Sequence, residues 1–324
     1  MIRVQEPGLS TTVQDTGRYG HYHIGMPPSG AMDQYAHKVA NYVAGNEADA
    51  ATLEMTYAGP TLEFEEDAVV AATGADMQPT LNGEDVPMWT AVQVEAGDVL
   101  SFEFATEGVR SYLAVAGGID VPKVMESRST YTLIGIGGHE GRDLQEGDEL
   151  PVGDADGNAT VGAAVDGDHV PDYAGEDTIS VVMGLCDYRL TDEGREQFLG
   201  TEWKVSDEAD RVGCRLTDGP DIEGMFEERE QPFGAGPDPT NVVDLGYPVG
   251  SIQMAGQPII LMQDAVTGGG YATVGTVTSV DRNVLAQART HSAITFEAVD
   301  VEEALESRAA HDEQLDAIRS EFLE

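Results

Sequence analysis

The 324-residue sequence predicts a mainly β protein built from barrels or sandwiches. Short apolar or alternating segments recur at regular spacing along the chain, and 38 glycines punctuate them. A chain of this length, with 41% hydrophobic residues, favours about two domains. The predicted strands include DAVVAAT, GDVLSFEF, RSYLAVAGG, TISVVMG, QPIILMQDA and SAITFEAVD, at residues 67–73, 97–104, 110–118, 178–184, 257–265 and 292–300.

Three segments depart from the strand pattern. Residues 31–44 place apolar side chains at i, i+3, i+4 and i+7, which predicts a helix that Gly45 caps at its C-terminus. Residues 301–323 predict a second helix, which we expect to pack on the second domain or on a partner. Residues 153–177 are rich in Gly, Asp and Ala with weak periodicity, so we place an exposed linker and the domain boundary there.

The net charge is unusual. The 59 Asp and Glu residues against 17 Lys and Arg give a formal charge of -42, which makes nucleic acid an unfavourable partner. Only Lys38, Lys123 and Lys204 are lysines, and the acids are spread along the whole sequence. We interpret this surface as adaptation to a salt-rich cytosol, where screening shortens self-repulsion. An acidic binding function is the alternative.

Cysteine usage and hydropathy predict a soluble, cytoplasmic protein. Cys186 and Cys214 lie far apart with no CxxC motif, so neither a disulfide framework nor a zinc knuckle is indicated. The first residues, MIRVQEPGLS, lack a basic region followed by an apolar run, and no apolar stretch is long enough to span a bilayer. We therefore expect no membrane association.

Residues 13–30, VQDTGRYGHYHIGMPPSG, combine Asp15, an arginine and two histidines with several glycines and prolines. His21 and His23 would share a face on a strand, but no third ligand lies nearby, so we expect no metal. The glycines and prolines suit a loop that leads to a helix, whose free amide groups attract anions. Ser29, Gly30 and Asp33 could line such a site, and Ser29 could equally serve only as the helix cap.

Two further clusters contain arginine. In ESRSTY, Arg128 lies among Ser127, Ser129 and Thr130, a combination suited to a carboxylate or phosphate. In SDEADRVGCRL, Arg211 and Arg215 lie four residues apart in a chain with few cations, although both could simply pair with local acids.

The segment QDAVTGGGY ends an apolar strand with Asp264 and continues through Thr267 and three glycines to Tyr271. Successive glycines permit close approach of the backbone to a ligand, or a tight turn. No Gly-Lys-Ser/Thr follows, so the segment is not a Walker A loop.

These clusters, in this order, resemble the biotin-dependent carboxyltransferase family. The resemblance extends from about residue 3 to residue 299 and includes PGLSTTVQDTGRYG, PPSGAMDQYAHKVANYVAGN, ATLEMTYAGPTLEF, VRSYLAVAGGIDVP, ESRSTY, SDEADRVGCRL and GSIQMAGQPIILMQDAVTGGGY. The family often has Gln-Thr-Thr-Gly-Gly-Tyr-Pro where this chain has Val266 to Ala272, so that glutamine and proline have no counterpart.

The resemblance implies two cyclophilin-like β-barrel subdomains with a few helices. It assigns residues 1–155 to a barrel like carboxyltransferase subdomain A and residues 178–300 to one like subdomain B. An acidic linker then occupies residues 156–177, and a C-terminal helix occupies residues 301–324.

For function, the resemblance implies the C subunit of an ATP-dependent 5-oxoprolinase, which hydrolyses 5-oxo-L-proline to L-glutamate. Asp15, Arg128 and Asp264 are then the candidate catalytic residues. We expect the arginines to bind carboxylate or phosphate groups and the aspartates to orient water or arginine. The candidate substrate-binding residues are Gln14, Arg18, Ser29, Gly30, Asp33, Ser127, Ser129, Thr130, Arg211, Arg215, Gln253, Thr267, Gly269, Gly270 and Tyr271.

The resemblance also implies partners. ATP would be bound together with two sibling 5-oxoprolinase subunits, one KipI-like and the other LamB/YcsF-like. None of the lysine contexts, AHKVA, VPKVM and EWKVS, is a biotinylation site between methionines, so we expect no biotin on this chain. One alternative is a carboxyltransferase that acts on urea or a similar amide, like subunit 2 of allophanate hydrolase. The other is a non-catalytic, KipA-like regulatory protein.

Overall fold

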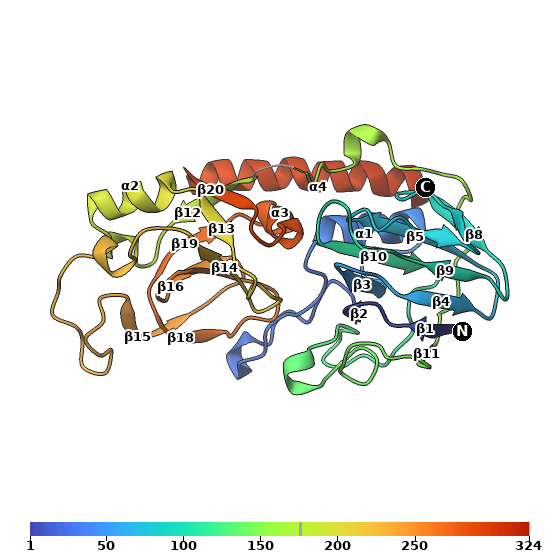
Figure 1. The fold of residues 1–324 in the computed structure, drawn as a ribbon, viewed down its shortest axis with the longest axis horizontal. Helices are drawn as coiled ribbons and strands as arrows, with labels where there is room; N and C mark the ends of the chain where they lie inside the picture. Colours follow the sequence, from blue (N-terminus) through green and yellow to red (C-terminus); the bar gives the residue numbers. More distant parts are fainter. Residues whose placement is uncertain (175–176, 324) are drawn as a thin grey trace. The chain divides into compact units, whose positions relative to one another are not determined.

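The computed structural model describes residues 1–174 and 177–323, which form two compact units. The first unit contains residues 1–18, 29–174 and 312–323, and the second contains residues 19–28 and 177–311. The mainly β class is confirmed in both units, which Figure 1 colours along the chain.

The first unit holds two antiparallel sheets. One has the strand order β11-β1-β4-β9-β6-β7 and the other has the order β2-β3-β10-β5-β8, so the strands lie in two layers rather than one closed ring. The bounds are β1 Ile2–Glu6, β2 Thr11–Gln14, β3 Thr52–Thr56, β4 Thr61–Phe64, β5 Ala68–Gly74, β6 Thr80–Leu81, β7 Glu84–Asp85, β8 Ala91–Val94, β9 Val99–Ser101, β10 Arg110–Val115 and β11 Glu149–Leu150. The main core lies between the sheets and joins Leu62 and Phe64 of β4 to Leu53 of β3 and Leu113 of β10.

Helix α1 (Gln34–Val43) covers the other face of the second sheet, where its apolar stripe packs on Tyr112 and Ala114 of β10. The helix begins later than the sequence predicts. Asp33, rather than Ser29, is its N-cap, because the Asp33 side chain accepts a hydrogen bond from Ala36 N. Residues 31 and 32 are instead held outside the helix, since Ala31 N donates to Asp15 O and Met32 N to the Glu54 carboxylate.

Most of residues 153–174, which the composition predicts as an exposed linker, are exposed, but some of them pack on the core of the first unit. Ala164 forms a β-bridge with Thr90, and Val165 and Tyr173 contact the core beside α1. Of the other predicted linker residues, 175 and 176 lie outside the described residues, and Asp177 is the first residue of strand β12. Residue 324 of the predicted C-terminal helix also lies outside the described residues.

The second unit contains a closed barrel of strand order β12-β19-β16-β17-β14-β13-β20, in which β12 and β20 pair in parallel. A separate two-stranded ribbon, β15-β18, adjoins it (Figure 1). The bounds are β12 Asp177–Met183, β13 Trp203–Val205, β14 Gly213–Thr217, β15 Asn241–Gly246, β16 Ser251–Met254, β17 Pro258–Leu261, β18 Gly268–Tyr271, β19 Thr273–Val277 and β20 Ala293–Val299. Helix α2 (Asp192–Gly200) packs on β20, where the rings of Phe198 and Phe296 stack 4.8 Å apart.

The remaining helices are α3 (Asp281–Gln287) and α4 (Val301–Leu323). The sequence predicts α4 but not α2 or α3. The first part of α4 belongs to the second unit, while Leu315 and Ile318 are buried in the first. Single 3₁₀ turns occur at η1 Tyr22–Ile24, η2 Thr132–Ile134, η3 Gly167–His169, η4 Asp187–Arg189 and η5 Glu223–Met225.

Candidate functional site

The predicted site residues fall into two groups, one in each unit. The group in the first unit gathers around Asp15, at the end of β2. It comprises Gln14, Asp15, Arg18, Ser29, Gly30, Asp33, Ser127, Arg128, Ser129 and Thr130. The group in the second unit comprises Arg211, Arg215, Gln253, Asp264, Thr267, Gly269, Gly270 and Tyr271.

Asp15 is buried, and its carboxylate accepts four hydrogen bonds. Oδ1 accepts from Ser127 Oγ at 2.7 Å, from Ser129 Oγ at 2.5 Å and from Gly17 N at 2.8 Å. Oδ2 accepts from Arg128 N at 2.6 Å. Burial alone would raise the pKa of Asp15, but these hydrogen bonds outweigh it and hold the pKa below its ordinary value. The carboxylate therefore stays ionised and fixes the Ser127–Ser129 turn against β2.

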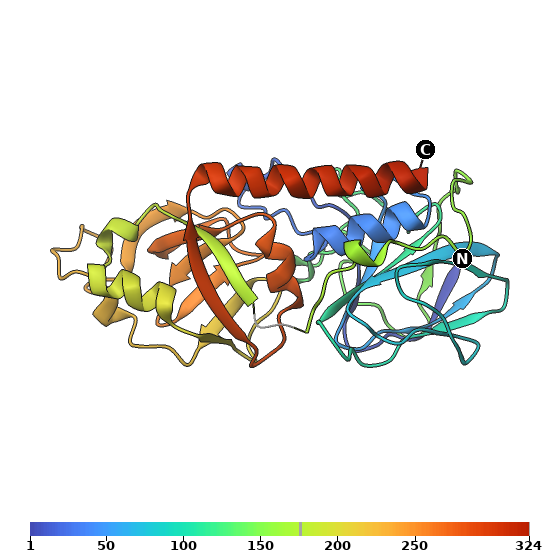
Figure 2. The same ribbon diagram turned by 90° about the horizontal axis from the view of Figure 1, so that it is seen from above.

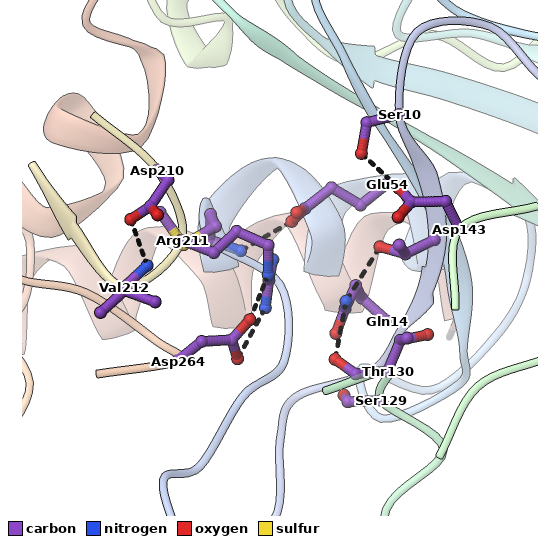
Figure 3. Close-up of polar contacts among 12 residues, drawn as sticks. Ser10, Gln14, Glu54, Ser129, Thr130, Asp143, Asp210, Arg211, Val212 and Asp264 are labelled. Carbon is purple, nitrogen blue, oxygen red and sulfur yellow. Dashed lines mark hydrogen bonds and ion pairs between the residues drawn. The ribbon is translucent and has the colours of Figure 1, made fainter. Parts of the chain in front are cut away.

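The same turn is fixed on its other side. Thr130 N donates to Val13 O at 2.9 Å, and Gln14 Nε2 donates to Thr130 O at 3.2 Å (Figure 3). The buried Arg18 guanidinium donates to Ser129 O through Nη2. Side chains at Gly137 or Gly138 would collide with Ser129 O or Thr130 Oγ1, which accounts for glycine at both positions.

Arg128 presents its side chain differently from its neighbours. Its Nε donates to Val121 O at 2.9 Å, and its Nη2 donates to Asp120 Oδ1 at 2.6 Å. The side chain is 24% exposed, whereas the other side chains of this group are buried. Arg128 is thus the member of the first group that a ligand could reach, and Asp15 positions it through the backbone.

Ser29 and Gln14, two members of the first group, have buried polar side chains. Ser29 has a φ of 52°, and among the described residues its hydroxyl and the Gln14 Oε1 atom have no hydrogen-bond partner. Both side chains are fully shielded from solvent. Gly30 is required next to Ser29, because a Cβ there would lie 2.8 Å from Gly17 N and Cα. Neither Ser29 nor Gln14 therefore presents a polar side-chain atom to solvent.

The sequence prediction missed a buried polar network behind α1. Glu54 Oε2 accepts from Tyr112 OH at 2.8 Å and from Met32 N at 2.8 Å, and Tyr112 OH accepts from Asp33 N at 2.8 Å. Burial raises the pKa of Tyr112 well above its ordinary value, and the nearby Glu54 raises it further. The available signal was a glutamate inside the otherwise apolar strand TLEMT, since a buried carboxylate needs partners.

His37 is buried beside this network and is neutral. Its Nε2 donates to Ala48 O at 3.1 Å, and its Nδ1 lies 2.9 Å from the Thr52 hydroxyl, which donates to it. Burial lowers the pKa of His37 to about 4, against smaller opposing effects that include Asp15 and Glu54.

In the second unit, Arg211 and Asp264 form a two-bonded ion pair. Arg211 Nε lies 2.7 Å from Asp264 Oδ2 and Nη2 lies 3.3 Å from Oδ1 (Figure 3). Asp264 N also donates to Arg211 O at 2.9 Å, which joins the end of β17 to the turn before β14. Asp264 is buried, while Arg211 keeps 16% of its side chain exposed. A guanidinium that is fixed in this way and partly exposed is suited to contact an anion.

Arg215 and Gln253 lie on barrel strands. Arg215 is half-buried on β14 and alternates with the buried Cys214 and Leu216, so it points away from the barrel core. Gln253 is buried on β16 and hydrogen-bonds the Tyr247 hydroxyl.

The run of glycines forms strand β18 rather than a tight turn, one of the two alternatives that the sequence leaves open. It pairs with β15, with Leu245 opposite Gly269. The Tyr247 hydroxyl accepts from Tyr271 N at 2.8 Å and donates to Tyr271 O at 2.9 Å. A Cβ on Gly269 would lie 2.9 Å from the Tyr247 ring, which explains glycine at that position. Thr267, Gly270 and Tyr271 are exposed or half-buried along this ribbon.

The histidine segment belongs to the second unit. Residues 22–24 form η1 rather than a strand, and His23 Nδ1 donates to Gly20 O at 3.1 Å. Across residues 1–174 and 177–323 no group of three or more His, Cys, Asp or Glu side chains could hold a metal ion.

Sequence reasoning also missed Arg282, which lies near Tyr19 and Tyr22 of this segment. Burial lowers its pKa, and Tyr19 and Tyr22 partly oppose that effect.

Comparisons with known proteins agree on one family. The family described as carboxyltransferase domain, subdomain A and B, matches residues 24–298. The C subunit of 5-oxoprolinase from Escherichia coli is 35% identical over 95% of this chain and 94% of its own length. The urea amidolyase of Saccharomyces cerevisiae is 32% identical over 98% of this chain, which spans only 18% of that protein. The structure of the K. lactis urea amidolyase superposes with a TM-score of 0.92 and 32% identity over 98% of this chain and 20% of that one.

Proposed function

This chain belongs to the family of carboxyltransferase domains that consist of subdomains A and B. We propose that it is the C subunit of an ATP-dependent 5-oxoprolinase. Such an enzyme hydrolyses 5-oxo-L-proline to L-glutamate. The observation that carries the proposal is the match to the C subunits of 5-oxoprolinases from two bacteria, along nearly the full length of those relatives. Most of each urea amidolyase, in contrast, lies outside the match.

The chemistry explains why accessible arginine side chains suit this reaction. The lactam is an amide stabilised by resonance, and phosphorylation of its oxygen would make the carbonyl carbon a better electrophile. The substrate carboxylate and the phosphorylated intermediate both carry negative charge. A guanidinium fork binds such groups through paired N–H donors.

The accessible residues are the proposed ligand contacts. Arg128 in the first unit, and Arg211 and Arg215 in the second, would each bind a carboxylate or phosphate group. Thr267 and Tyr271 would be further ligand contacts in the second unit. Asp264 would hold the Arg211 guanidinium in place, in keeping with their two contacts. The four bonds to the Asp15 carboxylate favour a positioning role toward Arg128 over the orientation of water.

Partners complete the proposal. ATP would be bound together with the two sibling subunits, one KipI-like and the other LamB/YcsF-like.

The described residues contain no helix that is both long and apolar enough to cross a bilayer. We also propose that the charge of -42 adapts the chain to a high-salt cytoplasm.

A second candidate is a carboxyltransferase that transfers CO2 from biotin to urea or a similar amide. The similarity to urea amidolyases in sequence and structure favours it. It needs a biotinylated partner, because Lys38, Lys123 and Lys204 lie in no context typical of biotinylation. A streptavidin blot of co-purifying proteins would detect such a partner.

The test of the main proposal is co-expression with the sibling subunits in high salt, followed by ATP-dependent assays with 5-oxoproline and with urea. We expect glutamate from 5-oxoproline, and no ATP consumption that depends on urea. Urea-dependent turnover with a biotinylated partner would instead support the carboxyltransferase.

A further inference from the structure

The segment between η5 and β15, residues 227–240, is a loop that extends away from the barrel of the second unit (Figures 1 and 2). Its sequence is EEREQPFGAGPDPT. Phe233, near its middle, is fully exposed to solvent, which is unusual for a phenylalanine. None of the proposed ligand contacts lies in this loop.

The loop is nevertheless held firmly at its base by Arg189 of η4. Arg189 is buried, and its guanidinium donates to Asn241 O at 2.9 Å, to Pro239 O at 2.8 Å and to Gln231 Oε1 at 3.2 Å. The Arg189 carbonyl accepts from Glu227 N at 2.9 Å. One buried residue therefore fixes both ends of the loop.

The tip is fixed as well. Gln231 Nε2 donates to Asp238 O at 2.8 Å, which links the two arms of the loop. Ala235 N donates to Pro232 O at 3.1 Å, which closes a β-turn with Phe233 and Gly234 at its centre. Gly234 has a φ of 94°, as the third residue of a type II turn requires. The Phe233 ring is thus displayed on a preorganised turn.

Preorganised exposed aromatic residues are typical anchors of protein interfaces, because little entropy is lost when they enter a pocket. The flanking charges restrict the partner. Glu227, Glu228 and Glu230 are exposed and only Arg229 opposes them. A second copy would bring the same carboxylates together, so a partner with cationic groups around its pocket is favoured.

We propose that residues 227–240 are a docking loop for one of the sibling subunits, whose apolar pocket accepts the Phe233 ring and whose basic side chains face Glu227, Glu228 and Glu230. The proposal rests on the proposed function, because that function supplies the sibling subunits.

The test is a binding titration of the purified chain against the KipI-like sibling and, separately, against the LamB/YcsF-like sibling. Phe233→Ala should raise the Kd for one of them at least ~30-fold, as for an interface anchor. Phe104→Ala is the control, since Phe104 is another exposed phenylalanine and lies in the first unit. The Kd of the Phe104→Ala variant should match that of the wild type. Both variants should retain the wild-type melting temperature.

The outcomes separate the two proposals. If wild-type chain binds one of the siblings and Phe233→Ala binds it equally well, the docking loop is wrong while the proposed function stands. If wild-type chain binds neither of them, and no 5-oxoprolinase activity can be reconstituted, both are wrong. Sedimentation of the chain alone adds a third arm, because a dimer that Phe233→Ala abolishes would show that the loop binds a second copy instead.

Discussion

Arg211 and Asp264 join two turns of the second unit through two side-chain contacts, of 2.7 and 3.3 Å, and one backbone hydrogen bond of 2.9 Å. Asp264 is buried and Arg211 is partly exposed, so the carboxylate orients a cation that a ligand can reach. This is the relationship on which the proposed anion binding in this unit depends.

Replacing Arg211 with lysine should reduce kcat/KM for 5-oxoproline in the reconstituted complex by about 10-fold or more, because an ammonium cannot form the planar fork. Arg195→Lys is the control, since Arg195 forms a more exposed pair with Asp187 at 3.3 Å. Steady-state kinetics of both variants would check this. Equal kcat/KM for Arg211→Lys and wild type would exclude the proposed role.

Asp15→Asn should destabilise the first unit by about 2 kcal/mol, because the new amide would place a donor against groups that already donate. Ser127→Ala removes one of the four hydrogen bonds to Asp15 and should cost less, roughly 1 kcal/mol. Chemical unfolding of the two variants at neutral pH measures the difference. If Asp15→Asn were as stable as wild type, the carboxylate would not hold the Ser127–Ser129 turn.

Much of the fold follows from local sequence. The apolar strands and most of helix α1 are visible because their periodicity reflects which face is buried. The start of α1 is not visible in this way. Residues 31 and 32 continue the apolar pattern, but their amides are taken by Asp15 O and the Glu54 carboxylate, which come from strands distant in the sequence.

The candidate site also combines features that the sequence predicts with features that depend on tertiary contacts. The SRST cluster and Asp15 are predicted and do meet, since Ser127, Ser129 and Arg128 N all contact the Asp15 carboxylate. The partners of Glu54, and the strand pairing that turns a glycine run into β18, depend on tertiary contacts. The fold also determines which predicted site residues a ligand can reach, because Ser29 is buried and Arg128 is partly exposed.

Acidic pH should destabilise the protein through His37. The pKa of His37 is about 4 in the folded protein, below its value of 6.5 in the absence of structure, so the unfolded chain binds more protons between these values. The stabilisation is complete above pH 6.5 and is lost as pH falls toward 4, with a loss of up to roughly 3 kcal/mol.

Unfolding curves at several pH values between 4.5 and 7 check this for wild type and for His37→Gln. The variant should show a weaker dependence on pH, whereas His291→Gln, at an exposed position, should behave as wild type. An unchanged slope in His37→Gln would mean that other groups cause the acid sensitivity.

Salt should stabilise the protein, since the charge of -42 creates strong self-repulsion at low ionic strength. The melting temperature should rise by on the order of 10 °C from 0.1 to 2 M KCl, with most of the gain by about 1 M, where the Debye length is about 3 Å. NaCl should act equally if screening is the cause. A melting temperature independent of salt would contradict the interpretation as halophilic adaptation.

The most direct test of the central claim is ATP-dependent glutamate release from 5-oxoproline by the sibling subunits, measured in high salt with and without this chain. We predict that release requires the chain and falls by at least ~100-fold in kcat/KM with Arg128→Ala, an effect of about 3 kcal/mol on the transition state, whereas Arg3→Ala, at an exposed ion pair, leaves it unchanged. Glutamate release that proceeds equally well without the chain, or undiminished with Arg128→Ala, would contradict the account.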